Sequence, residues 1–348
     1  MATLRSQFAD ALTNIEVNGR KRERAIAAHT EIRDLLASDQ QLRAWGINAR
    51  LIGSYSRHTA RYPGKDVDVF ARFDSLDTSA MPRTVYEAVQ AVLVDEYGIA
   101  ADGGRATPQD RSIKVEFRDP DDENDDNQAF AIDAVPAVRD GDRWGIPTKD
   151  RKRWAESTGR WVTTDPERFG ELSSNLSTSL YSPSVAGQNA YKPIVKLMRQ
   201  ARHVHIGDKR PGGLFVEFAV YDVWFSGAIT GDEWDPLFAA TLRAVANRFG
   251  TAPYIPLLDP AMGTPVAPAL ADDVWANARD EFARLATLAE EAVAVEKCAA
   301  ATKWREILGE NERGQVFPLP PGCDAGGFPI SAIASIAGLG TNEARKFA

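Results

Sequence analysis

Apolar and polar residues alternate along this chain with two different periods, and each period occupies its own region. From about residue 49 to residue 148, apolar positions recur at every second residue in short runs, as in Lys65–Phe73 (KDVDVFARF), which is typical of half-buried strands. Ser112–Phe117 is expected to be an antiparallel neighbour of the apolar strand Phe130–Val138. One helical pattern, over residues 82–97, interrupts the strands. This region therefore predicts a mixed sheet with a helix packed against it.

Helical spacing dominates the rest of the chain. Residues 5–38 are predicted to form one long helix, and further helices are predicted over 191–203, 214–228, 234–249 and 272–300. The pattern predicts an α+β fold, with a sheet core and N-terminal helix at 1–183, a helical lobe at 184–316 and a tail at 317–348. Ligands commonly bind in the cleft between two such lobes.

A Gly-Ser pair follows the first predicted strand. Gly53 permits a close turn and a close approach of the backbone to a ligand. The residues after Ser54 are expected to begin a short helix, whose free N–H groups attract phosphate. The Ser54 hydroxyl adds a donor. This turn is therefore a candidate site for a triphosphate.

Two aspartates follow the turn at alternate positions of a predicted strand. Side chains at such positions share one face of a sheet, so Asp66 and Asp68 point the same way, while Val67 and Val69 point into the core. Two adjacent carboxylates repel each other, and a hard cation such as Mg²⁺ removes that cost by taking carboxylate oxygens together with substrate phosphates. The pair therefore predicts a divalent cation site.

A third acid, Asp133, stands in the middle of the apolar strand 130–138. A charge within a buried strand is costly unless it is paired or bound to a metal. Three carboxylates on adjacent strands could hold two metal ions ~4 Å apart for in-line phosphoryl displacement. Each feature has a structural explanation when taken alone, since Gly-Ser turns and exposed Asp-x-Asp strands are common. Their joint occurrence in this order favours phosphoryl chemistry on a nucleoside triphosphate.

The combination resembles the nucleotidyltransferase superfamily that includes DNA polymerase β. Further segments resemble the bacterial cGAS/DncV-like nucleotidyltransferases (CD-NTases, SMODS-type). These segments are DAVPA (133–137), RWGIPT and GRWVTTDPERF before the helical lobe, YKPIVKLMRQ (191–200), LLDPAM (257–262) and AATKWREILG (300–309). The resemblance covers about residues 1–310. It implies a polymerase β-like core and a C-terminal helical lobe, with the active site in the cleft between them. His58 stands where the family often has a small residue.

The resemblance also implies roles for individual residues. Asp66, Asp68 and Asp133 would bind two Mg²⁺ ions, for which Mn²⁺ could substitute, and Asp133 would help to activate the attacking ribose hydroxyl. Gly53 and Ser54 would hold the triphosphate, and Lys196 and Arg199 would neutralise phosphate charge. NTPs, with ATP among them, would be the substrates. The product would be a cyclic di- or trinucleotide second messenger that acts on an effector in bacterial anti-phage (CBASS) signalling.

Two other functions are compatible with the same motif. One is an acceptor-dependent transferase that nucleotidylates a protein, a tRNA or a small molecule. The other is a nucleotide-binding scaffold without catalysis, against which the intact triad argues. Labelled NTP added to the protein alone separates the first from a cyclic synthase, because only the synthase needs no further acceptor.

Composition narrows the expectations further. The net charge of −8 argues against a polymerase or a long-RNA binder. Nothing in the sequence resembles the zinc insertion of the DNA-activated human relative, cyclic GMP–AMP synthase, so no nucleic-acid activator is expected. No apolar stretch approaches the ~20 residues that span a bilayer, and the N-terminus lacks the features of a secretory signal. Two cysteines, Cys298 and Cys323, form neither a disulfide framework nor a metal-ligand pattern, which fits a cytoplasmic location.

The segment from Phe317 to Ala348 differs from the rest, because proline and glycine punctuate it and large apolar residues are few. A partly ordered tail is the simpler interpretation. The sharper hypothesis, from the resemblance, is a C-terminus that a ubiquitin-transfer-like partner conjugates to other molecules. Intact mass spectrometry after coexpression tests this, and an unmodified Ala348 in every condition would count against it.

Overall fold

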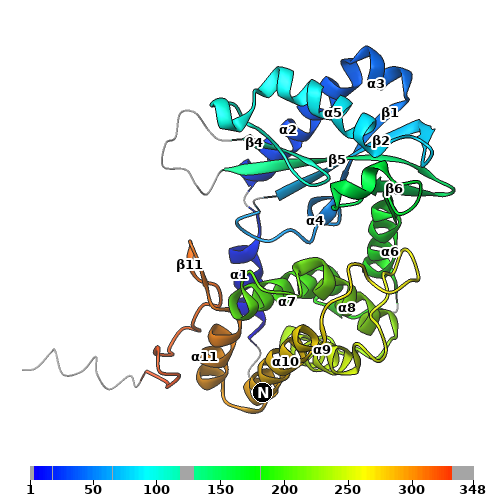
Figure 1. Cartoon of the computed structure of the whole chain (residues 1–348). Coiled ribbons are helices and arrows are strands. Elements are labelled where there is room, and N and C mark those ends of the chain that lie inside the picture. The colour runs from blue at the N-terminus through cyan, green and yellow to red at the C-terminus, as the bar shows by residue number, and fades with distance from the viewer. Residues whose placement is uncertain (1–3, 18, 65, 118–128, 181, 331–348) are drawn as a thin grey trace, which may run out of the picture.

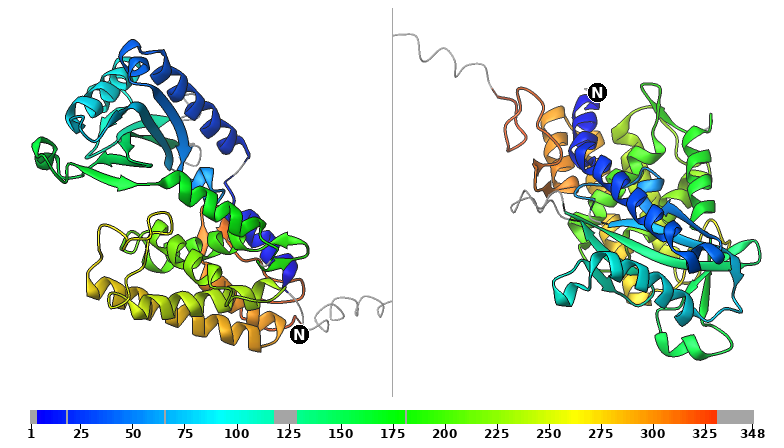
Figure 2. Two further views of the ribbon diagram at one scale, coloured as in Figure 1. Left: turned by 90° about the vertical axis from the view of Figure 1, so that its right-hand side faces the viewer. Right: turned by 90° about the horizontal axis from the view of Figure 1, so that it is seen from above.

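A mixed sheet and a bundle of helices form two lobes, one above the other in Figure 1. The computed structural model describes residues 4–17, 19–64, 66–117, 129–180 and 182–330. Figure 2 shows the sheet with helices on its outer side and the helical lobe facing its other side. The α+β architecture expected from the sequence is confirmed.

The sheet runs in the order β1-β2-β5-β4-β3, and β6 continues from β5 to β7. Strands β2 and β5 pair in parallel, and the other pairs are antiparallel. The predicted neighbours at 112–117 and 130–138 do pair. The strands are β1 (Ile47–Ile52), β2 (Asp66–Asp77), β3 (Ala106–Pro108), β4 (Ile113–Phe117), β5 (Phe130–Asp140), β6 (Arg143–Pro147) and β7 (Trp161–Thr164).

Three helices cover the outer face of the sheet: α2 (Gly19–Ser38), α3 (Gln40–Ala44) and α5 (Pro82–Tyr97). The predicted helix at 82–97 coincides with α5, which has Pro82 in its first turn and stops at Gly98, where φ is +67°. The predicted inward positions of the second strand, Val67 and Val69, are buried beneath these helices.

The helical lobe has its own apolar core. Phe8 packs edge-on against Trp304 and Phe317, with ring centroids 5.2 and 5.0 Å apart. The lobe therefore draws on both ends of the described chain. Its helices are α1 (Arg5–Ile15), α6 (Pro166–Thr178), α7 (Tyr191–Ile206), α8 (Gly213–Phe225), α9 (Trp234–Thr251), α10 (Asp272–Ala294) and α11 (Lys297–Leu308). Two short hairpins, β8–β9 (Ser184–Val185, Gln188–Asn189) and β10–β11 (Glu310–Asn311, Gly314–Gln315), complete it.

Two predicted helices are wrong in their extent. The helix predicted over 5–38 is two helices, because the backbone becomes extended at Glu16. This break lets α1 join the core of the helical lobe while α2 covers the sheet. The helix predicted over 272–300 also breaks, at Val295 and Glu296, which lets α11 fold back and bury Trp304. The domain boundaries predicted at 183 and 316 stay a prediction.

The cysteines correct a second expectation. Cys298 on α11 and Cys323 in the following loop form a disulfide with their Cα atoms 5.3 Å apart. Two cysteines far apart in sequence, one of them in a loop, gave no indication of this pairing. The segment that follows α11 is therefore linked back to it at Cys323. Of the predicted tail 317–348, residues 331–348, where the conjugation hypothesis falls, lie outside the described residues. Within the part of the chain that the structure describes, no helix is long and apolar enough to cross a membrane.

Candidate active site

The Gly-Ser turn forms the short helix α4 (Gly53–Ser56) directly after β1, as the sequence predicts. Gly53 has φ of +73°, a backbone conformation that residues with a Cβ rarely adopt. A Cβ at this position would lie 1.9 Å from Oδ2 of Asp68. Glycine is therefore required both by the backbone and by the carboxylate that packs against it.

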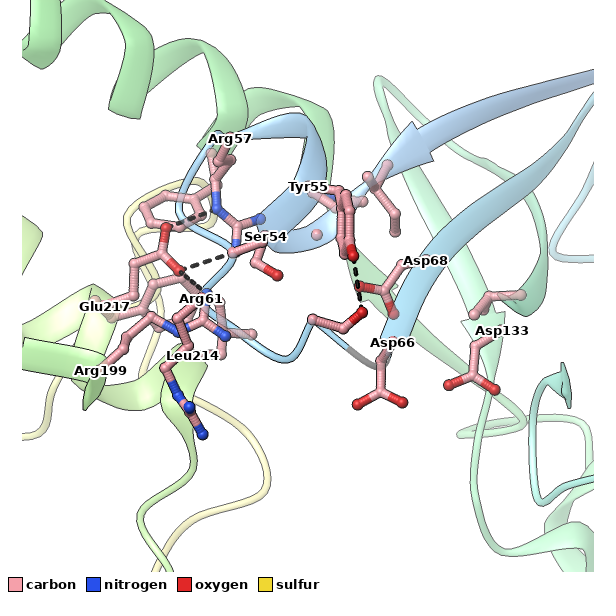
Figure 3. A pocket seen from close by; sticks show the side chains of 18 of the residues that line it. Ser54, Tyr55, Arg57, Arg61, Asp66, Asp68, Asp133, Arg199, Leu214 and Glu217 are labelled. Atoms are coloured by element: carbon pink, nitrogen blue, oxygen red, sulfur yellow. Dashed lines mark hydrogen bonds and ion pairs between the residues drawn. The ribbon is translucent and has the colours of Figure 1, made fainter. Parts of the chain in front are cut away.

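Strand pairing brings the three acids together. Asp68 is opposite Ile52 of β1 on one side and opposite Asp133 of β5 on the other. Asp66 precedes Asp68 by two residues and shares its face of the sheet. Figure 3 shows the three carboxylates along one wall of a cleft, with Ser54 facing them. The structure thus places Gly53, Ser54 and the predicted triad in one site.

Burial disfavours the charged forms of two of these acids. It raises the pKa of Asp68 from its ordinary 3.8 to about 6, and the carboxylate of Asp133 adds to the effect. Burial also raises the pKa of Asp133 to about 6, with a further contribution from Asp66. Lys114, opposite Asp133 on β4, opposes this rise. The site therefore holds negative charge that nearby cations of the protein do not fully neutralise.

The chemistry of this wall suits a hard divalent cation. All the donors are carboxylate oxygens, which such ions prefer. Oδ1 of Asp133 is buried and has no hydrogen-bond partner, so it retains its full capacity to bind a cation. Among the described residues, no three His, Cys, Asp or Glu side chains are gathered into a ready metal-binding cluster. A bound ion would thus need further oxygen ligands, such as those of substrate phosphates.

Arg61 and Arg199 lie across the cleft from the carboxylates (Figure 3). The cleft has a volume of about 870 Å³ and is lined by Arg61, Arg199 and Arg202 as well as the triad. Burial, with Arg199 and Arg202 adding to it, lowers the pKa of Arg61 to about 10. These guanidinium groups raise one another's energy and would be stabilised by an anion between them. Cations facing carboxylates across a cleft suit a triphosphate with its metal.

Neither Lys196 nor His58 lines the cleft. Arg199 lines the cleft, whereas Lys196, three residues earlier on α7, does not. Nζ of Lys196 is 2.7 Å from Oε1 of Glu16. His58 adopts a left-handed backbone conformation, with φ of +59°, which histidine tolerates better than most residues with a Cβ. It is not among the cleft-lining residues, and its Nδ1 is 3.5 Å from Nη2 of Arg22.

Sequence reasoning missed a buried acid in the helical lobe. Glu217 of α8 is fully buried and forms an ion pair with Arg57, the residue that ends α4. A signal existed, because Glu217 is the one acid inside the apolar run LFVEFAVY. A buried charge in such a run demands a partner. Its partner comes from the other lobe, beside the Gly-Ser turn.

Comparison with known proteins agrees with this geometry. Residues 1–175 match the family model described as Second Messenger Oligonucleotide or Dinucleotide Synthetase (SMODS) domain. The match spans just over half of the chain. The chain belongs to the SMODS family. As a SMODS protein it is a nucleotidyltransferase, and the predicted class of activity, synthesis of a cyclic oligonucleotide messenger in bacterial CBASS signalling, is confirmed.

Relatives of this SMODS protein cover nearly its whole length. The cyclic AMP-AMP-AMP synthase of Acinetobacter sp. (strain ATCC 27244 / 9458) is 24% identical over 319 residues, which is 88% of this chain and 84% of that protein. Among solved structures, the CD-NTase CdnG of Bradyrhizobium diazoefficiens, in complex with GTP, has a TM-score of 0.65 at 14% identity, with 88% and 95% of the two chains covered. CdnC of Escherichia coli MS115-1 with ATP has a TM-score of 0.63 at 13% identity, with 90% and 98% covered. These similarities confirm the predicted fold. Members of the family generally use a divalent metal ion.

Proposed function

We propose that this SMODS protein joins nucleotides with ATP among its substrates, using two Mg²⁺ ions held by Asp66, Asp68 and Asp133. The similarity to a cyclic AMP-AMP-AMP synthase supports ATP as a substrate. The cation chemistry is supported by three carboxylates on one face, two of them with a raised pKa. When bound, the metal ions would neutralise charge that develops on the phosphates.

The residues of the chain divide the remaining tasks. Gly53 and Ser54 hold the donor triphosphate through backbone N–H groups and a hydroxyl. Arg199, together with Arg61 and Arg202, neutralises phosphate charge from the other wall. Lys196, which the resemblance also suggested, would act only indirectly, because it is paired with Glu16.

The carboxylate of Asp133 accepts the proton of the attacking ribose hydroxyl. The hydroxyl oxygen then forms a bond to the α-phosphorus of the donor, and the bond to pyrophosphate breaks. A final transfer of the same kind, between the ends of the linear product, closes the ring and releases another pyrophosphate. The single observation that carries this proposal is the parallel register that sets Asp68 beside Asp133 and next to the turn at Gly53.

The product would act on a downstream effector, and the enzyme would work in the cytoplasm, where NTPs are made. No nucleic-acid activator is expected. These points rest on the sequence and on the family, and each is open to direct test. Conjugation of the C-terminus remains a hypothesis about residues 331–348.

The deciding experiment incubates the purified protein with all four NTPs and Mg²⁺ or Mn²⁺, followed by phosphatase treatment and mass spectrometry. A phosphatase-resistant cyclic species that contains AMP supports the proposal, and its mass gives the ring size. The control is the double variant Asp66→Asn, Asp68→Asn, which should give no product. A product that appears only after addition of a protein, tRNA or small-molecule acceptor would instead identify an acceptor-dependent transferase.

A further inference from the structure

A buried ion pair joins the phosphate turn to the helical lobe. Nε of Arg57 donates to Oε1 of Glu217 at 2.8 Å, and Nη2 donates to Oε2 at 3.1 Å. The side chain of Arg57 is 5% exposed and that of Glu217 is 0% exposed. Figure 3 shows this pair on the wall opposite the triad. Two parallel hydrogen bonds between planar groups fix orientation as well as distance.

Neighbouring groups complete the environment of the pair. Oγ1 of Thr59 donates to Oε1 of Glu217 at 3.0 Å, and Nη1 of Arg199 donates to the backbone oxygen of Thr59 at 2.7 Å. The guanidinium of Arg57 also lies over the ring of Phe169 on α6, 4.8 Å from its centre. Although burial would raise the pKa of Glu217, Arg57 and Arg199 hold it below its ordinary value. The carboxylate of Glu217 is therefore charged, and the neighbouring guanidinium groups balance its charge.

The segment that carries Arg57 is tied to the turn by its backbone. The N–H of Arg57 donates to the oxygen of Gly53 at 3.3 Å, and the N–H of Thr59 donates to the oxygen of Ser54 at 2.9 Å. The four-residue helix α4 has no side-chain cap at Ile52 and is too short to be stable alone. Whatever fixes Arg57 and Thr59 therefore also fixes Gly53 and Ser54.

We infer that Glu217 and Arg57 are positioning residues, which set the phosphate turn in register with the helical lobe so that the donor triphosphate meets the triad in a reactive geometry. This inference rests on the proposed role of Gly53 and Ser54. It assigns a function in catalysis to a buried acid in the lobe opposite the carboxylates. In variants of this pair, Arg199 and Arg61 would still supply positive charge to the cleft. KM for the substrate should therefore change less than kcat, which depends on how the substrate is aligned.

The test measures kcat and KM for ATP in Glu217→Gln and Arg57→Lys, with folding checked by thermal unfolding. Glu217→Gln should lower kcat ~10–100-fold, because misplacement of a reacting group by ~1 Å costs about that much, while KM changes far less. Arg57→Lys retains the charge but loses the fork, so an intermediate loss of kcat is expected. The double variant Arg57→Gln, Glu217→Gln should lose no more kcat than Glu217→Gln alone, because both substitutions break the same ion pair.

A matched control exists in the same molecule. Arg72 of β2 pairs with Glu167 of α6, which links the sheet to a helix, and neither residue lines the cleft. Arg72→Gln should keep kcat within about twofold of the unaltered protein. Product formation by the unaltered protein in the same assay tests the proposed function separately.

Two results would overturn the inference: a folded Glu217→Gln variant with unchanged kcat, whether or not its KM rises, or additive losses of kcat in the double variant. If Glu217→Gln does not fold, Arg57→Lys provides the test, because Glu217 still faces a positive charge in that variant. Full activity of Arg57→Lys would then reject the positioning role, and a fall in its kcat at unchanged KM would support it.

Discussion

Gly53 and Asp68 are packed so closely that the smallest side chain on Gly53 would collide with the carboxylate, 1.9 Å from its Oδ2 atom. The Gly-Ser turn and Asp68, the central acid of the triad, are thus parts of one contact. A shift in either displaces the other.

Gly53→Ala should therefore reduce product formation at least ~100-fold, because the new methyl group must push Asp68 or the turn away from its position. Gly141→Ala is the matched control. Gly141 also has a positive φ, +64°, but nothing lies within 4 Å of its Cβ position. A steady-state assay of both variants separates the effect of backbone strain from that of the collision. Equal losses of product formation in the two variants would contradict the role of the contact between Gly53 and Asp68.

Asp68→Asn should stabilise the metal-free protein while abolishing activity. Because burial raises the pKa of Asp68 from 3.8 to about 6, the folded chain binds more protons than the unfolded chain between these values. The free energy of unfolding therefore falls by roughly 1–3 kcal/mol as the pH rises through this window. At pH 7.5 in EDTA, Asp68→Asn should melt a few degrees above the unaltered protein, and the gap should close near pH 4. An Asp68→Asn protein that melts lower at pH 7.5 would contradict the raised pKa.

Arg199 and Lys196 should differ sharply when each is replaced. Arg199→Met removes a cation that lines the cleft and should raise KM for ATP ~10-fold or more, as expected when a charge-assisted contact to phosphate is lost. Lys196→Met removes an ion pair with Glu16 at the edge of α1 and should change KM less than about threefold. Initial-rate kinetics on both variants gives the comparison. A larger rise in KM for Lys196→Met than for Arg199→Met would instead support the phosphate-neutralising role that the family resemblance suggested for Lys196.

The disulfide should contribute measurably to stability under oxidising conditions. Cys298 and Cys323 are separated by 25 residues, and a closed loop of that length contributes ~3 kcal/mol through the unfolded state. Dithiothreitol should lower the melting temperature of the unaltered protein but not that of Cys298→Ser, Cys323→Ser. Two reactive thiols in the native, unreduced protein would show that the bond does not form.

The central part of the site could be predicted because its signals are local. Alternation in the second strand places Asp66 and Asp68 on one face, and glycine before serine predicts the turn. The register of Asp68 against Asp133 could not be derived in this way, since the pairing of distant strands depends on the whole sheet. The resemblance to the family, in which a third acid follows on a later strand, indicated that Asp133 belongs with this pair.

The remaining errors come from tertiary packing. Nothing in the sequence near Val295 forbids a helix, and the break there accompanies the burial of Trp304 in the helical lobe. Lys196 and Arg199 are three residues apart on one helix, so only the docking of the two lobes decides which of them lines the cleft. Glu217 could have been singled out as a buried acid, but its partner in the other lobe could not.

The pairing of β2 with β5 has a consequence for how this enzyme can diverge. Asp68 and Asp133 are neighbours through strand register and not through the length of chain between them. Evolution can therefore lengthen or shorten the intervening loops without disturbing the two carboxylates. One residue inserted within either strand before its acid would turn that carboxylate to the opposite face of the sheet.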